Sequence, residues 1–292
     1  MEFILKLFIG ALMIGGVYGV LGMGYCLVYK STGLMNLAQG DFMMFGAFLG
    51  LTYFKYFSLP FPAAIMLTFA TMFVIGFCVE RFLILRLIKR GSGFAFVILC
   101  TAAAGMILQN GAMLIWGPIM LSFPGIFSVN TVDLGIIQVA PESLLVLGVA
   151  IVCAFVLYVF LNKTRFGTAV RAAAMDEDAA SSVGIDAAMT KSIAWGMSAG
   201  LAGVIGASVG PVFGVYTAMG SLIGQKAFAG AVAGGYGNVF GALAGGMLFG
   251  FLETFTGAYL TTTYKDVIVF AVLIAMLMVI PNGIFREKVI EL

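Results

Sequence analysis

Histidine is absent from this chain of 292 residues. Its absence removes the most common general base, the most common metal ligand and any Ser-His or Cys-His nucleophile pair. Charge is scarce as well, since Asp, Glu, Lys and Arg make up 10% of the residues, against about 25% in an average soluble domain. Few enzyme classes remain open, and we expect no catalytic residue, no metal and no cofactor.

Cysteine usage and net charge exclude two further classes of protein. The four cysteines lie inside apolar runs rather than in paired or metal-spaced motifs, which predicts buried reduced thiols instead of a disulfide scaffold. They are Cys26, Cys78, Cys100 and Cys153. The net charge of +2 is too small and too dispersed for a surface that follows nucleic-acid phosphates.

Hydrophobic residues are what the chain has in excess. They make up 62% of the sequence, and the mean hydropathy is +1.12. A folded soluble chain of this size would still expose about a quarter of its unfolded surface to water, so this much apolar surface cannot be hidden inside a globule. The solvent must be lipid, and the sequence predicts an all-α polytopic membrane protein.

Long uncharged stretches indicate the membrane segments. They are 7–29, 56–79, 91–132, 143–162, 192–225, 227–252 and 267–285. A spanning helix needs about 20 mostly apolar residues, so several stretches hold one helix and some hold more. Between the first two, a polar break at 30–33 precedes a short apolar segment at 42–54, which predicts a loop feeding a short or broken helix. We expect eight or nine transmembrane or re-entrant helices.

Lysine and arginine predict the orientation, because they gather on the cytoplasmic side of membrane proteins. The residues expected inside are Lys30, then Arg81, Arg86, Lys89 and Arg90, then Lys163, Arg165, Arg171 and Lys191, and finally Arg286 and Lys288. Lys6, Lys55 and Lys265 remain outside. This distribution places the C-terminus in the cytoplasm and requires the Gly-rich stretch 217–237 to cross or re-enter the membrane.

Two connections between membrane segments are long. The outer one, 118–142, has room for a short surface or re-entrant element. The inner one, 163–191, is Ala-rich and charged between 168 and 180, which predicts one helix outside the bilayer, ended by Gly184.

Many glycines recur at a spacing of four residues. The series are Gly15 and Gly19, then Gly230 and Gly234, then Gly237, Gly241 and Gly245, and one residue on Gly246 and Gly250. Such spacing puts small residues on one helix face and predicts tight packing between helices. The alternative is that these helices line a pathway and slide against each other.

Four charged residues fall in the predicted membrane region, where each needs a partner or a wet surface. Glu253 and Lys226 either pair with each other or act in transport. Asp41 either stabilises a helix N-terminus or lies on a pathway. Glu80 is expected to form an ion pair with Arg81 at the membrane edge.

A polar patch precedes Asp41 in an otherwise apolar region. Non-helical backbone at membrane depth is tolerated where it is buried by protein or faces a cavity, so this patch points to a translocation route. The predicted pathway residues are Asn36, Gln39, Gly40, Asp41, Lys226 and Glu253.

Several blocks of sequence resemble the branched-chain amino acid ABC transporter permeases. They are Tyr29 to Asp41, Arg165 to Ala172, Gly184-Ile185, Lys226 to Phe228, Gly234 to Gly237 and Pro281 to Phe285. They occur in the family's order and cover nearly the whole chain. The resemblance implies that 1–292 is a single transmembrane permease domain of a multi-pass protein of the bacterial inner membrane.

The resemblance also implies partners. It implies the pore-forming subunit of an importer driven by two cytoplasmic ATPase subunits, with substrate delivered by a periplasmic or lipid-anchored binding protein. The chain has no phosphate-binding loop of its own, which agrees with an external energy source. The second permease is either a copy of this chain or a related chain, and the resemblance favours a related one.

The inner connection, about 163–191, looks like the coupling loop of ABC importer permeases. Its Asp178-Ala179-Ala180 and Gly184 are similar to a Glu-Ala-Ala-x-x-x-Gly motif, with Asp in place of Glu, and the motif's later Ile-x-Leu-Pro part is not found. The predicted ATPase-coupling residues are Arg165, Gly167, Arg171, Asp178, Ala179, Ala180 and Gly184. The alternative is a solvated surface helix without a partner.

The expected substrates are leucine, isoleucine and valine. The same family includes permeases for urea, short-chain amides and other small solutes, so these remain alternatives. A different class is an ion-coupled secondary transporter, in which Asp41, Glu253 and Lys226 would be the coupling groups.

Overall fold

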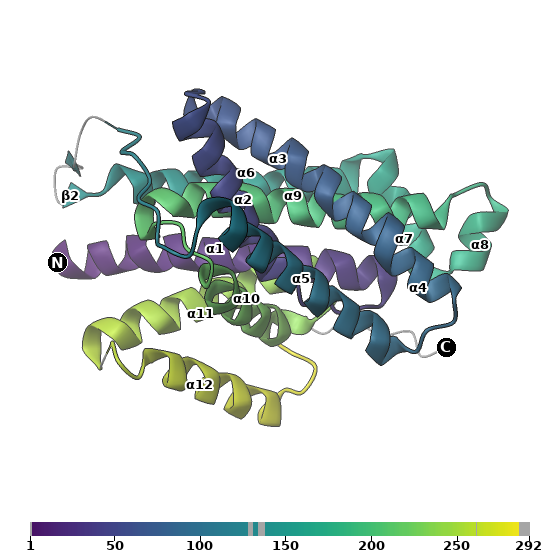
Figure 1. Ribbon diagram of the computed structural model, residues 1–292. Coiled ribbons are helices and arrows are strands. Elements are labelled where there is room, and N and C mark those ends of the chain that lie inside the picture. The colour runs from purple at the N-terminus through teal and green to yellow at the C-terminus, as the bar shows by residue number, and fades with distance from the viewer. Residues whose placement is uncertain (1, 128–130, 134–137, 261, 286–292) are drawn as a thin grey trace.

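The computed structural model describes residues 2–127, 131–133, 138–260 and 262–285 (Figure 1). Nearly all of its regular structure is helical. The elements are α1 (Glu2–Thr32), α2 (Gln39–Leu51), the π-helical turn η1 (Thr52–Tyr56), α3 (Phe61–Cys78), a second π-helical turn η2 (Val79–Ile84), α4 (Leu85–Lys89), α5 (Phe94–Trp116), β1 (Val132–Asp133), β2 (Gln138–Val139), α6 (Pro141–Lys163), α7 (Arg165–Met175), α8 (Glu177–Ser182), α9 (Ala187–Phe213), α10 (Met219–Gly235), α11 (Val239–Tyr259) and α12 (Lys265–Val279).

Six helical segments in the described part of the chain are long and apolar enough to cross a membrane. They are α1, the continuous segment Phe61–Lys89, α5, α6, α9 and α11. The helices α2, α10 and α12 are shorter, with 13, 17 and 15 residues. The prediction of an all-α polytopic membrane protein is confirmed, while the exact number of crossings stays a prediction.

Two long antiparallel helices, α1 and α9, lie side by side through the middle of the molecule, and α7 and α8 lie at one end (Figure 1). The α9 helix is almost entirely buried, because α2 and α3 pack along one side of it and α1 and α6 along another. The α1 helix packs most extensively against α11.

Glycine allows these helices to pack closely, as its spacing predicts. Gly15 and Gly19 of α1 face Gly250 and Gly246 of α11, and a Cβ atom at Gly15 would lie 2.8 Å from the Cα of Met247. Two other glycines of α11 serve a second interface, since Gly241 and Gly245 pack against α10 at Gly234 and Gly230. Gly237 does not belong to either stripe: it lies in the turn before α11 with φ +107°.

The broken helix predicted after the first span is present, and the same arrangement occurs twice. Gly33 (φ +69°) ends α1, and the chain then folds back to begin α2 at Gln39. Gly214 (φ +73°) ends α9, and the chain then begins α10 at Met219. Because α1 and α9 are antiparallel, these two units run in opposite directions, and their short helices meet in the interior.

The inner connection differs from the predicted single helix over 168–180. It forms two helices, α7 and α8, because Asp176 leaves helical geometry and its side chain accepts a hydrogen bond from the Ala179 amide at 2.9 Å, which caps the start of α8. Gly184 follows the second helix with φ +88°, in agreement with its predicted role as a stop.

The outer connection contains a small surface element, as expected. The strands β1 and β2 pair antiparallel, and an isolated bridge joins Leu121 to Val215 near the end of α9. Among the cysteines, Cys26 and Cys153 are buried as predicted, whereas Cys78 and Cys100 are partly exposed. The basic residues Arg286 and Lys288 lie outside the described residues.

Candidate functional site

A cavity of about 380 Å³ lies where the first turns of α2 and α10 meet. We call it the central cavity. Its walls are Tyr25 of α1, Leu37, Gly40 and Asp41 around the start of α2, Gly220, Ser221, Gly224, Gln225, Phe228 and Ala229 of α10, and Phe270 and Leu273 of α12. Two of the predicted pathway residues, Gly40 and Asp41, therefore line it.

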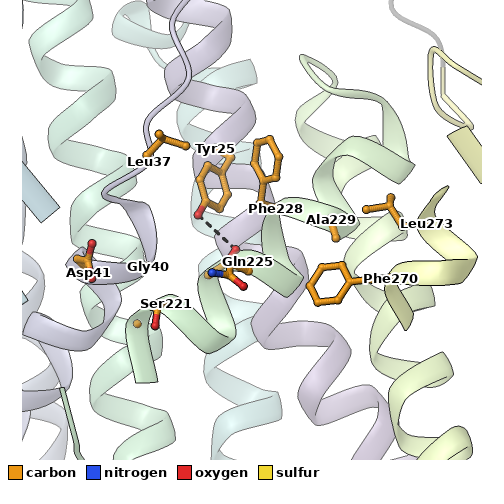
Figure 2. A pocket seen from close by; sticks show the side chains of 12 residues that line it. Tyr25, Leu37, Gly40, Asp41, Ser221, Gln225, Phe228, Ala229, Phe270 and Leu273 are labelled. Carbon is orange, nitrogen blue, oxygen red and sulfur yellow. Dashed lines mark hydrogen bonds between the residues drawn. The ribbon is translucent and has the colours of Figure 1, made fainter. Parts of the chain in front are cut away.

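Glycine makes the meeting of α2 and α10 possible. A Cβ atom at Gly220 would lie 2.7 Å from the Gly40 carbonyl oxygen, and one at Gly224 would lie 2.8 Å from the Gly40 Cα. Figure 2 shows the Tyr25 ring beside Phe228, with its hydroxyl donating to the Gly224 carbonyl at 3.3 Å. The cavity thus combines aromatic walls with two helix N-termini, whose amide dipoles favour negative charge.

Asp41 lies in the first turn of α2, although the N-cap position belongs to Ala38. Its carboxylate also lies close to Gly105 of α5, so that a side chain at Gly105 would collide with it. The carboxylate is placed to stabilise the helix N-terminus and also lies on the cavity wall, and its role on a pathway stays a prediction.

Asn36 and Gln39 are placed differently from Gly40 and Asp41. Both are buried, and Asn36 donates to the Gln39 side chain at 3.2 Å and accepts from the Ala38 amide at 3.1 Å. Gln39 reaches α9, where it donates to the Ser198 carbonyl at 3.3 Å. These two residues hold the break between α1 and α2 against α9, and they do not line the central cavity.

A second cavity, of about 260 Å³, contains most of the buried charge, and we call it the charged cavity. It includes Lys226 and Glu253, which pair at 2.7 Å, so the sequence interpretation that they pair with each other is confirmed. Lys226 also contacts Asp266 at 2.7 Å, and Glu253 contacts Lys265 at 2.9 Å.

Three members of this network were not predicted from the sequence. Tyr18 donates to the other oxygen of Glu253 at 2.6 Å, and Lys265 and Asp266 reach the pair from the first turn of α12. Tyr18 is indistinguishable from the other tyrosines in apolar segments, and the distance in sequence between Tyr18 and Glu253 is 235 residues. The sequence does contain one signal for this network, which is the pair of charged residues Lys265 and Asp266 at the start of an apolar run.

The predicted ion pair between Glu80 and Arg81 is wrong. Glu80 is completely buried in η2, where its carboxylate accepts a hydrogen bond from Ser192 of α9. In the described part of the chain no ion pair joins Glu80 to Arg81. The π-helical turn explains the difference, because it shifts the register of the helix and directs Glu80 toward α9 rather than toward the membrane edge.

The predicted coupling residues gather at the end of the molecule formed by α7 and α8 (Figure 1). Thr164 caps α7 by accepting from the Gly167 amide at 3.0 Å, and Gly167 packs directly on the backbone at the end of α6. Arg171 donates to Asn162 at 3.2 Å, which fixes α7 to α6. Arg165 is exposed at the start of α7.

The α8 helix is attached to α9 by a small apolar cluster and one ion pair. Ala180 is buried with Ala173 and Ala187, whereas Asp178, Ala179 and Gly184 are exposed. Glu177 pairs with Lys191 at 2.6 Å. This arrangement presents one face of a short helix to solvent and connects the helix to α9, which is long and apolar enough to cross a membrane.

Relatives of known type match nearly the whole chain. The high-affinity branched-chain amino acid transport system permease protein LivH of Escherichia coli (strain K12) is 29% identical, over 99% of this chain and 97% of its own length. A probable branched-chain amino acid transport permease protein LivH of Methanocaldococcus jannaschii is 31% identical, over 94% of this chain and 90% of its own length. The solved structure of PsaBC from Streptococcus pneumoniae in complex with Fab is similar with a TM-score of 0.49 and 14% identity, over 99% of this chain and 93% of that one.

A family described as the permease component of branched-chain amino acid transport systems matches residues 7–277. The match contains both cavities and the α7–α8 region within one stretch of sequence. Together with the membrane-crossing helices, it shows that this chain is a multi-pass membrane protein that belongs to the family of branched-chain amino acid transport system permease components.

Proposed function

We propose that this chain is the pore-forming permease subunit of an ATP-driven importer of branched-chain amino acids in the bacterial inner membrane. The observation that carries the proposal is the family match over residues 7–277, supported by relatives named for branched-chain amino acid transport along nearly the full chain. In this proposal residues 1–292 act as one permease domain, and the chain itself catalyses no reaction.

The proposed importer divides ATP hydrolysis, membrane transport and substrate delivery among several subunits. Two ATPase subunits bind the cytoplasmic end, a second permease completes the membrane core, and a solute-binding protein delivers the substrate from outside. The α7–α8 region is the docking element for an ATPase. Arg165, Arg171 and Asp178 orient it, and Ala179, Ala180, Gly167 and Gly184 provide the close packing and the turn that a short lever needs.

The translocation pathway in this proposal runs along the meeting point of α2 and α10. Gly40 and Asp41 line it at the central cavity, Lys226 and Glu253 line the charged cavity, and Asn36 and Gln39 hold the broken segment in place. Short helices that begin inside the membrane are the usual construction of a solute site, because their N-termini and the adjacent loops provide polar groups at depth.

The test is uptake by the reconstituted importer. The chain is purified with its co-purifying subunits, placed in vesicles with the binding protein, and supplied with labelled leucine and ATP. Uptake that requires ATP hydrolysis is expected, with urea and short-chain amides not transported. Leucine uptake that survives ATP depletion and follows an ion gradient would instead establish the secondary transporter, and uptake of urea alone would assign the other substrate class.

A further inference from the structure

The charged cavity contains a balanced set of ionic groups. Two ammonium groups, those of Lys226 and Lys265, face two carboxylates, those of Glu253 and Asp266, and every contact among them lies between 2.7 and 2.9 Å. A charge inside the bilayer costs about 2.5–3.5 kcal/mol on insertion scales, and a buried ion pair is often no more stable than an apolar replacement. Packing alone therefore gives no reason for the buried pair of Lys226 and Glu253.

Exposure divides the four groups into an inner and an outer pair. The side chains of Lys226 and Glu253 are 10% and 5% exposed, whereas those of Lys265 and Asp266 are 37% and 48% exposed. The outer pair comes from the start of α12, at the end of the molecule opposite α7 and α8 (Figure 1). The outer groups can exchange partners with a solute at low cost, because water already reaches them.

The remaining walls of the cavity are aliphatic on one part and aromatic on another, where Tyr18, Phe213 and Tyr216 lie. Ile14 and Val17 of α1, Val209 of α9, and Leu222 and Ile223 of α10 surround the charges. A volume of about 260 Å³ is just below the range of roughly 300–1,000 Å³ that is typical of drug-sized ligands, so the cavity suits a small solute. The central cavity lacks this combination, since its described lining includes one carboxylate and no cation.

We infer that the charged cavity is a binding site for a zwitterionic amino acid with an aliphatic side chain. The α-carboxylate of the amino acid replaces Asp266 as a partner of Lys226 and also faces Lys265. The released carboxylate of Asp266 and that of Glu253 face the α-ammonium group. The side chain of the amino acid lies against the aliphatic wall. The exchange keeps the number of ion pairs unchanged or increases it. This inference rests on the proposed function and gives the permease its own selectivity for both charged ends of the substrate.

The experiment measures equilibrium binding of labelled leucine to the detergent-purified importer without its binding protein. Two competitors each lack one charge: 4-methylpentanoate has no ammonium group and 3-methylbutylamine has no carboxylate. Leucine and isoleucine should compete, and both truncated compounds should compete about tenfold less well or worse, because one charge-assisted contact set is lost. Equal competition by either truncated compound, or no leucine binding to the importer, would overturn the inference.

Single substitutions test whether leucine binds in the charged cavity. Lys265→Gln should weaken leucine binding about tenfold, whereas Lys6→Gln, which removes a positive charge from an exposed position at the same end of the molecule, should leave it unchanged. Equal affinity in the two variants would overturn the inference. Leu222→Trp provides a second measurement that keeps all four charges. It should weaken the binding of leucine more than that of alanine, because the larger side chain fills the aliphatic part of the cavity. An equal effect on both amino acids would count against the site.

ATP-dependent uptake by the wild-type importer is measured in parallel. ATP-dependent uptake without detectable leucine binding would exclude a binding site in the charged cavity and leave the proposed function standing. Binding that depends on Lys265 in an importer without ATP-driven uptake would support the site and remove the proposed function.

Discussion

Ser192, in the second turn of α9, donates a hydrogen bond to the buried carboxylate of Glu80 in η2. The preceding residue, Lys191, pairs with Glu177 of α8 at 2.6 Å. Two adjacent residues of α9 therefore connect the exposed helix α8 with the membrane segment that contains α3. In an importer, this is a direct route by which a displacement of α8 would reach α3 and α9 together.

Ser192→Ala should destabilise the protein, because it leaves Glu80 buried without its hydrogen-bond donor. A lost bond to a buried charged group costs about 1.5–3 kcal/mol. The matched control is Ser208→Ala on the same helix. Within the described residues the buried Ser208 hydroxyl bonds only to the Val204 carbonyl one turn away, so this variant should have the smaller effect. Thermal unfolding in detergent measures both, and equal melting temperatures would contradict the assigned role of Ser192.

Gly184→Val should separate ATP hydrolysis from uptake. The φ of +88° at Gly184 disfavours any residue with a side chain, at a cost of about 1–2 kcal/mol, so the turn after α8 should reorient. We expect lower leucine uptake per ATP hydrolysed, with a normal amount of protein in the membrane. Gly148→Val in α6 is the control, because open space surrounds that position and its helical backbone accepts a side chain. An unchanged ratio of uptake to hydrolysis would exclude a coupling role for this turn.

Gly40→Ala should disrupt the contact between α2 and α10. The added methyl group would collide with the Gly220 carbonyl, a backbone atom that cannot move without shifting α10. Overpacking of this kind costs about 1–3 kcal/mol and should reduce both the melting temperature and the uptake rate. Gly111→Ala in α5, which meets no atom within 4 Å, should leave both unchanged. A tolerated Gly40→Ala would show that the two helices do not need this approach.

Glu253→Gln should be far more destabilising than Asp266→Asn, although each removes one carboxylate from the same network. The Glu253 side chain is 5% exposed and that of Asp266 is 48% exposed. Breaking a buried pair costs about 3–5 kcal/mol, whereas a half-exposed partner contributes less than about 1 kcal/mol because water screens it. Melting temperatures of the two variants, measured in the same detergent, give the comparison, and similar values would contradict the burial of Glu253.

Hydrophobic composition, charge spacing and glycine spacing determine much of the fold. The excess of apolar residues required a lipid-embedded helical protein, the polar break after residue 29 indicated the short helix α2, and the four-residue glycine spacing indicated the close packing of α1, α10 and α11. These features are local, because a helix needs a continuous apolar run and a stripe repeats within one helix. The family was also recognisable at this level, since its sequence blocks are contiguous.

Tertiary structure decided which of these residues come together. Tyr18 meets Glu253 across 235 residues, Ser192 meets Glu80 across 112, and the starts of α2 and α10 meet at Gly40 and Gly220. The prediction of one inner helix was wrong, because the cap at Asp176 competes with a propensity that favours one continuous helix. The predicted partner of Glu80 was also wrong, because a π-helical turn changes the direction of a side chain without changing composition. The sequence determines which segments enter the membrane, whereas the partners of a charge inside it depend on distances between segments that no local pattern encodes.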